Sequence, residues 1–121
     1  MVIIIITNMV KEEEFIFKNK IYKIKIGQNK QDNWDLIDAS NPNDIWFHTS
    51  DYSSSHIVLE NIDNEKIQKQ VIKRCACICK AHSKAKTEKN IDIIYAPIYS
   101  IKKTSIIGQV ITPNNVKTVC V

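Results

Sequence analysis

Glycine is scarce in this sequence, with only two among 121 residues. Turns must therefore rely on Asn, Asp and Ser, which also tolerate a left-handed backbone. Long apolar runs are absent too, and none approaches the ~18 residues that a membrane span needs. The opening stretch MVIIII has no basic residue before it and no small-residue cleavage site after it, so it does not resemble a signal peptide. We expect a soluble, intracellular, cytoplasmic protein.

The four cysteines do not form a familiar framework. Cys75, Cys77 and Cys79 occupy alternate positions in a helical pattern, and Cys120 is far from them in sequence. This spacing fits neither a disulfide scaffold nor the C-x-x-C of zinc sites. Cys75, Cys79 and His82 would share one helix face, which leaves a metal site as the alternative to buried, reduced thiols. We expect reduced thiols, no metal and no cofactor.

Charge is distributed unevenly along the chain. Residues 1–62 hold six Lys/Arg and nine Asp/Glu, whereas residues 63–121 hold eleven and four. A length of 121 residues suits one domain, so both halves are expected to belong to a single domain, 1–121. A basic half favours an anionic partner, most often nucleic acid. An ordinary solvated surface is the alternative.

The hydrophobic pattern predicts an α+β fold. We expect a mixed, mostly antiparallel sheet of six to eight strands, with one main helix packed on a face. Strands are predicted at residues 2–7, 15–18, 21–26, 44–48, 55–59, 91–99, 105–112 and 116–121. The second and third should form a hairpin around Asn19, and the last two a hairpin across Pro113. A short helix should be anchored by Trp34, Leu36 and Ile37.

The main helix has the clearest pattern in the chain. It is predicted to start at Asp63, as its N-cap, and to end near Ser83. At ~100° per residue its apolar side chains fall on one face. The opposite face carries a stripe of lysines, Lys66, Lys69, Lys73, Lys80 and Lys84. This stripe is either a phosphate-binding surface or merely a solvated face.

The stretch NDIWFHTSDYSSSHIVL, residues 43–59, is dense in reactive side chains. His48, Asp51 and His56 would form the acid–base set of an enzyme. The chain lacks a G-x-S-x-G elbow, a Walker A motif and a G-x-G-x-x-G motif. A polar loop that binds a polyanion is therefore favoured over catalysis. Trp46 and Phe47 alternate along a strand, so one ring should lie in the core, and only the other would be free to stack.

Several short segments carry a resemblance to a known family. They are IGQNKQDN, NDIWFH, SSH before an aliphatic strand, HSKAK, IIYAPIYSIKK and GQV…VKTVCV. In order and spacing they resemble the NFACT-R domain, the C-terminal RNA-binding module of the ribosome quality-control NFACT proteins. The similarity runs from about Tyr22 to Val121. The short length and the opening residues look more like the small eukaryotic coiled-coil-containing relatives, so we expect a stand-alone domain.

The resemblance implies an RNA partner, tRNA or ribosomal RNA, and binding without chemistry. DNA and ribosome-associated proteins are further partners to consider. The full NFACT proteins also have an N-terminal domain, a helical hairpin and a long coiled coil that do not occur in this sequence, so only the binding role is carried over. Two departures stand out: Gln28 replaces a usual Arg, and Ser53 and Ser54 replace a usual Pro-Gly.

Resemblance and charge together predict the binding residues. They are Asn29, Gln31, Asn33, His48, Ser55, His56, Lys73, Lys80, Lys84, Lys86, Lys102 and Lys103. Lysines are natural phosphate partners, and the histidines and serine are able to hydrogen-bond phosphate, ribose or a base. Asp32 and Asp51 are expected to orient their neighbours, since carboxylates repel phosphate, and Trp46 is expected to be mainly structural. The competing hypotheses are a nucleic-acid- or nucleotide-processing enzyme and a protein-interaction adaptor that uses the basic helix face.

Overall fold

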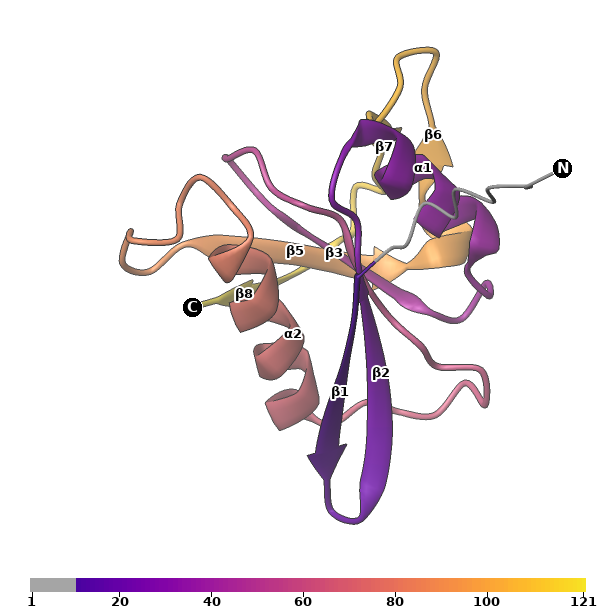
Figure 1. Cartoon of the computed structure of the whole chain (residues 1–121), viewed down its shortest axis with the longest axis vertical. Helices are drawn as coiled ribbons and strands as arrows, with labels where there is room; N and C mark the ends of the chain where they lie inside the picture. The colour runs from indigo at the N-terminus through magenta and orange to yellow at the C-terminus, as the bar shows by residue number, and fades with distance from the viewer. Residues whose placement is uncertain (1–10) are drawn as a thin grey trace, which may run out of the picture.

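The computed structural model describes residues 11–121, so the strand expected at 2–7 lies outside the described residues. The described part has an α+β fold, as predicted. Its elements are β1 (Lys11–Phe17), β2 (Lys20–Ile26), α1 (Lys30–Ala39), β3 (Ile45–Thr49), β4 (Ile57–Leu59), α2 (Lys69–Ala81), β5 (Asp92–Pro97), η1 (Ile98–Ser100), β6 (Lys102–Lys103), β7 (Val110–Ile111) and β8 (Lys117–Cys120). Six strands form an antiparallel sheet in the order β1-β2-β4-β3-β5-β8, and β6 pairs with β7 in a small second sheet (Figure 1).

The predicted first hairpin is confirmed. Phe15 pairs with Tyr22, and the two residues of the turn, Lys18 and Asn19, have φ angles of 49° and 65°. Two consecutive residues with positive φ form the type of turn whose twist matches that of the flanking strands. The hairpin extends away from the rest of the sheet (Figure 1), and near its turn Lys20 forms an ion pair with Glu65 in the loop before α2.

The two helices cover opposite faces of the sheet. Successive side chains of β4 alternate: Ile57 and Leu59 join the core beneath α2, whereas Val58 joins the core beneath α1. In β3, Phe47 likewise faces α2 and Trp46 faces α1. Both rings are buried, with 0% and 1% of their surface exposed. The expectation that only one ring is buried was wrong, because a helix covers each face.

The main helix starts later than predicted. α2 begins at Lys69, and the residue before it, Gln68, makes no side-chain capping bond. The predicted N-cap, Asp63, lies in a loop that Asn61 organises: its Oδ1 accepts from the Glu65 N–H at 3.1 Å, and its Nδ2 donates to the Glu65 carbonyl at 3.0 Å. This side chain holds the backbone polar groups of Glu65 in the loop, and the helix starts four residues later.

The predicted C-terminal hairpin is also wrong. β7 pairs with β6, and β8 crosses to the edge of the main sheet beside β5. There Val119 pairs with Ile93 and packs against the main core. Val121 exchanges two backbone hydrogen bonds with Ile91, each 2.9 Å long, which places the C-terminal end beside the segment between α2 and β5 (Figure 1). Burial of the apolar face of β8 decides its partner.

The thiols are arranged as expected for reduced cysteines. Cys75 and Cys79 are buried, whereas Cys77 and Cys120 are exposed. Burial raises the pKa of the Cys79 thiol to about 12 and also raises the pKa of Cys75. Within residues 11–121, no group of three His, Cys, Asp or Glu side chains is placed to hold a metal ion. Neither helix in the described part of the chain is long and apolar enough to cross a membrane.

Alkylation should therefore divide the thiols into two pairs. In the native protein iodoacetamide should label Cys77 and Cys120 within minutes, because only a thiolate that solvent reaches is reactive. Cys75 and Cys79 should be labelled only in denaturant, which serves as the control for complete labelling. Peptide mass spectrometry at successive times measures the rates. Labelling of Cys75 as fast as that of Cys77 would contradict this packing.

Candidate nucleic-acid interface

Three aromatic side chains, two from β3 and one from the residue before β4, form a cluster on the α1 face. The indole Nε1 of Trp46 donates to Nδ1 of His56 at 3.1 Å, and the Trp46 ring stacks on His48 with 5.7 Å between centroids. The two imidazoles meet edge to face at 5.2 Å. His56 is 3% exposed, and His48 is partly exposed. Trp46 is therefore buried in contact with both histidines.

Both histidines are neutral at physiological pH. Burial lowers the pKa of His56 to about 3, with a further contribution from His48. Burial also lowers the pKa of His48, although hydrogen bonds to the backbone oppose this effect. Because Nδ1 of His56 accepts from the indole, its proton lies on Nε2; Nδ1 of His48 faces the Thr49 carbonyl at 2.7 Å and carries a proton. With these tautomers the cluster presents the Nε2–H of His56 as a donor and Nε2 of His48 as an acceptor, and it carries no positive charge.

Asn33 connects this cluster to α1. Its Oδ1 accepts from the backbone N–H of His56 at 3.2 Å, and the His56 carbonyl accepts from the N–H of Gly27 at 2.9 Å. A Cβ atom on Gly27 would lie 2.0 Å from the Asn33 Oδ1, so glycine is required there. The first turn of α1 is further fixed by Asn29, whose side chain accepts from the Asp32 N–H at 2.8 Å. Asn29 and Asn33 thus have positioning roles.

A groove of about 270 Å³ opens beside this cluster. We call it the α1 groove; its lining residues are Gly27, Gln28, Asn29, Lys30, Asn33, Ser53, Ser54, Ser55, His82 and Lys84. The serine loop is held in place by backbone hydrogen bonds from Ser55 N–H to the His82 carbonyl at 3.2 Å and from Lys84 N–H to the Ser53 carbonyl at 3.0 Å. Segments far apart in sequence therefore form one surface.

The α1 groove suits an anion. None of its lining residues carries a carboxylate, and two of them are lysines, Lys30 and Lys84. It also contains the N-terminal turn of a ten-residue helix, where backbone N–H groups and the helix dipole favour negative charge. Asn33 is 8% exposed. Its Nδ2 has no acceptor among residues 11–121, so this donor is available to a ligand. The hydroxyls of the serine loop add further donors.

The lysines of α2 extend this basic surface. Lys69, Lys73 and Lys80 lie within about 40° of each other around the helix axis, and we call them the lysine row. Lys69 and Lys73 are exposed, and Lys80 is half-buried, with its Nζ donating to the Val121 carbonyl at 3.2 Å. The lysine row thus lies on the β8 side of α2. Lys66 and Lys84, predicted in the same helix, lie before and after it.

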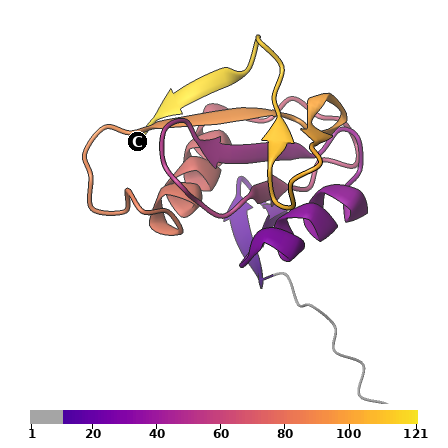
Figure 2. The same cartoon turned by 90° about the horizontal axis from the view of Figure 1, so that it is seen from above.

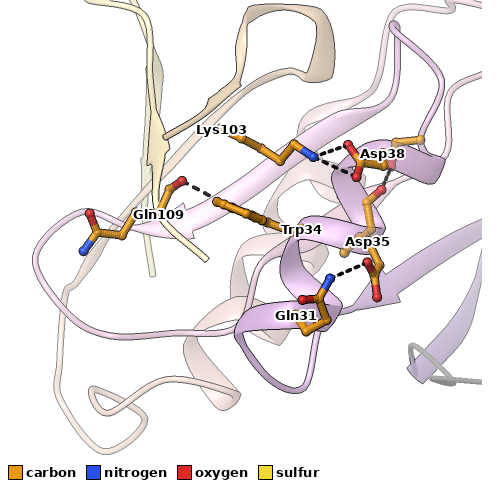
Figure 3. Close-up of polar contacts among 8 residues, drawn as sticks. Gln31, Trp34, Asp35, Asp38, Lys103 and Gln109 are labelled. Carbon is orange, nitrogen blue, oxygen red and sulfur yellow. Dashed lines mark hydrogen bonds and ion pairs between the residues drawn. The ribbon is translucent and has the colours of Figure 1, made fainter. Parts of the chain in front are cut away.

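Other predicted binding residues lie elsewhere or have partners already. Gln31 donates to Asp35 at 2.8 Å along the exposed side of α1, and Lys103 forms an ion pair of 2.7 Å with Asp38 (Figure 3). Lys103 also lies over the Trp34 ring at 5.2 Å. Together with a hydrogen bond from the Trp34 indole to the Gln109 carbonyl, these contacts attach the β6–β7 sheet to α1 (Figures 2 and 3).

The remaining predicted residues are dispersed. Lys86 and Lys102 are exposed, Lys86 in the turn after α2 and Lys102 in β6. Asp32 is buried, and its Oδ2 accepts from the Gln28 N–H at 3.3 Å, while its Oδ1 has no partner in the described chain. Asp51 is exposed and makes no hydrogen bond to either imidazole among the described residues. The acid–base set of His48, Asp51 and His56 is therefore not assembled in this structure.

Sequence reasoning missed Lys30 and His82 as members of the same surface. Lys30 follows the N-cap of α1 directly, so its position at a helix N-terminus was a usable signal. His82 was weighed only as a metal ligand, although it adjoins the SKAK segment. Its place beside the serine loop depends on a tertiary contact, the isolated bridge between Ser54 and Ser83.

The NFACT protein RNA binding domain family matches residues 11–118. This chain belongs to that family. Coiled-coil domain-containing protein 25 of Bos taurus is 39% identical over 88 residues, which are 69% of this chain and 42% of that protein. The Rqc2 homolog RqcH of Bacillus subtilis is 32% identical over 81 residues, which cover 66% of this chain and 14% of RqcH.

A solved structure has a similar fold. The C-terminal part of the fibronectin/fibrinogen-binding protein from Streptococcus suis aligns with a TM-score of 0.80 and 24% identity, over 96% of this chain and 47% of that one. At this identity the likeness concerns the fold alone. The chain spans less than half the length of the bovine relative and a smaller share of RqcH, so the activities of those whole proteins do not transfer directly.

Proposed function

We propose that this NFACT RNA-binding domain binds RNA without chemistry, through the α1 groove and the adjoining lysine row. The observation that carries the proposal is the lining of the α1 groove, which has two lysines, a helix N-terminus and no carboxylate. Phosphate contacts supply most of the affinity of such surfaces. The histidine cluster would contribute one neutral donor, on His56, and one acceptor, on His48, at the edge of the same site, where a base or a ribose hydroxyl is a suitable partner.

The RNA is proposed to belong to the translation machinery, either tRNA or ribosomal RNA. The resemblance to the NFACT proteins and the likeness to the Rqc2 homolog RqcH support this choice. The histidine cluster beside the α1 groove supports binding over catalysis, because burial lowers the pKa of both imidazoles and so makes them weak bases, and neither has a carboxylate partner in the described chain. A role in ribosome-associated quality control would require further partners, and ribosome-associated proteins are the natural candidates.

Titration of fluorescently labelled RNA with the purified domain tests the proposal. The protein should bind tRNA, and Lys30→Gln combined with Lys84→Gln should weaken binding roughly tenfold through the loss of two phosphate contacts. The control is Lys18→Gln combined with Lys23→Gln, which removes the same charge from the distant β1–β2 hairpin and should have little effect. Labelled RNA recovered from the incubation should be intact.

Three results would change the proposal. Equal weakening by the groove and hairpin variants would indicate that only the net charge of the domain matters. Cleavage of RNA that disappears in His48→Ala would support the enzyme hypothesis instead. An acidic protein that competes with RNA for the same lysines would favour the adaptor hypothesis. Competition between tRNA, ribosomal RNA fragments and DNA of equal length ranks the nucleic acids.

A further inference from the structure

A second groove lies near the other end of α2. It has a volume of about 560 Å³ and is bounded by the loop before α2, the end of β5, η1 and the segment before β8. Its lining includes two tyrosines, Tyr95 and Tyr99, and several asparagines, among them Asn43 and Asn115. We call it the tyrosine groove. Of the predicted lysine stripe only Lys66 lies in it.

The walls of the tyrosine groove are fixed by buried backbone contacts. The Asp44 carboxylate, 1% exposed, accepts from the Asn61 N–H at 2.8 Å. The Asp44 carbonyl accepts from the Ile98 N–H at 2.8 Å, and the Tyr99 N–H donates to the Pro42 carbonyl at 3.0 Å. These bonds connect three separate loops, so the groove is formed before any ligand arrives. A preformed site avoids the entropy cost of ordering loops on binding.

The aromatic rings of this groove are available to different degrees. Tyr99 is 68% exposed, which is unusual for a large ring on a short helical turn that is itself tied to the core. Tyr95 is partly exposed and stacks on the buried Phe47 ring at 5.5 Å and 23°. An exposed ring offers a face for stacking, and carboxamides offer both donors and acceptors. A nucleobase has the complementary features, a flat apolar face and a polar edge.

The charge around the tyrosine groove is complementary to a phosphate backbone. Lys66 and Lys117 line it, and its single carboxylate among the lining residues, Glu65, is in an ion pair with Lys20. Lys117 is the first residue of β8. The lysine row lies on the β8 side of α2, as the contact between Lys80 and the Val121 carbonyl shows. The basic surface therefore continues from the tyrosine groove along α2 toward the α1 groove.

Resting on the RNA binding proposed above, we propose that the tyrosine groove holds unpaired nucleobases of the bound RNA, stacked on Tyr99, while the phosphates follow the lysine row. The strand length fits this path. The 13 residues of α2 span roughly 20 Å at 1.5 Å per residue, a distance that a few extended nucleotides cover. The site is therefore specific for single-stranded RNA, because bases in a duplex are already stacked and paired.

Substitutions at Tyr99 test this inference. Tyr99→Ala should weaken binding of a short single-stranded oligoribonucleotide by roughly 10- to 100-fold, the range found when a stacking ring is removed. Tyr99→Phe keeps the ring and should bind within a few-fold of the unaltered protein. The slope of log affinity against log salt should not change in either variant, because no phosphate contact is lost. Duplex RNA should bind equally well to all three proteins.

Tyr99→Ile separates stacking from simple apolar docking. It retains an apolar side chain without a π face, so it should behave like Tyr99→Ala. If it binds single-stranded RNA as tightly as the unaltered protein, the nucleobase assignment is overturned. Unchanged affinity in Tyr99→Ala would likewise overturn it, and RNA binding through the α1 groove would still stand. If the unaltered protein binds no RNA, the proposed function fails, and this inference fails with it. Thermal unfolding of each variant verifies that the exposed position is tolerated.

Discussion

Lowering the pH from 7 to 5 should reduce the free energy of unfolding of this domain by about 2 kcal/mol. The cause is His56, whose pKa burial lowers to about 3 in the folded protein. In the unfolded chain the same imidazole has an ordinary pKa of about 6.5. Between these two values only the unfolded state takes up the proton. Stability is therefore fully present above pH 6.5 and is lost as the pH falls toward 3.

The geometry explains why the folded protein resists protonation of His56. Its Nδ1 already accepts the Trp46 indole proton at 3.1 Å, and a protonated ring would lose that bond. The His48 ring lies 5.2 Å away, so a charge on either imidazole disfavours a charge on the other. His48 itself has a lowered pKa, and it adds to the loss of stability in the same direction.

Urea unfolding at a series of pH values measures this effect. The midpoint should shift downward below pH 6.5 with little change in the slope against denaturant. The control is His56→Gln, which lacks the titrating group; it should be less stable at pH 7 and less sensitive to pH. A stability that is constant between pH 7 and pH 5 would show that His56 takes up its proton in the folded state, and the buried Trp46–His56 hydrogen bond would then need to be revised.

The elements predicted correctly are those whose hydrophobic period is visible within the segment itself. The alternation of Tyr22, Ile24 and Ile26 predicted a strand with one buried face, and all three are buried in β2. The same holds for the helix of Leu36 and Ile37, whose polar neighbours left one side for the core. The spacing of the apolar residues is enough to assign these elements, because each one buries an apolar face regardless of which element packs against it.

Boundaries and partners depended on contacts that no local pattern contains. α2 starts at Lys69 because the Asn61 side chain binds the backbone of Glu65. An Asn eight residues before a helix does not predict where that helix starts. β8 leaves its predicted partner because Val119 reaches the main core beside Ile93. In both cases a tertiary interaction outweighed a reasonable local signal.

The candidate site was predicted in part. The resemblance named His48 and His56, and the structure places them in one cluster with Trp46. It did not indicate that both rings would be neutral, since the pKa depends on burial. The two grooves were not foreseeable, because each is lined by segments brought together only in the fold. The ion pair of Lys103 with Asp38 joins residues 65 positions apart and likewise has no sequence signal.

Neutralising the basic face should produce the other large effect. In the triple variant Lys73→Gln, Lys80→Gln and Lys84→Gln, each lost phosphate contact reduces the magnitude of the salt slope of log affinity for RNA by roughly 0.7–0.9. Three lost contacts change the slope by about 2 and weaken binding roughly 50-fold at physiological salt. The loss should be similar for unrelated sequences, because phosphate contacts position the strand without reading bases.

The fold should tolerate these changes. Lys73 and Lys84 are exposed, and Lys80 gives up a single hydrogen bond to the Val121 carbonyl, so stability should change by about 1 kcal/mol or less. The matched control is Lys11→Gln, Lys18→Gln and Lys23→Gln. It removes the same charge from exposed positions on the β1–β2 hairpin and should leave the salt slope almost unaltered.

The salt slope must be measured on RNA itself, because an acidic protein partner would also bind the triple variant more weakly. An unchanged slope in that variant would show that the outer side of α2 is only solvated, and the α1 groove would then bind RNA through Lys30 and its neutral donors alone. If the double variant Lys73→Gln and Lys80→Gln, which keeps Lys84, still has a reduced salt slope, phosphate contacts are assigned to Lys73 and Lys80. The strand would then run along α2, in the direction that the tyrosine groove requires, because those two lysines lie between the two grooves.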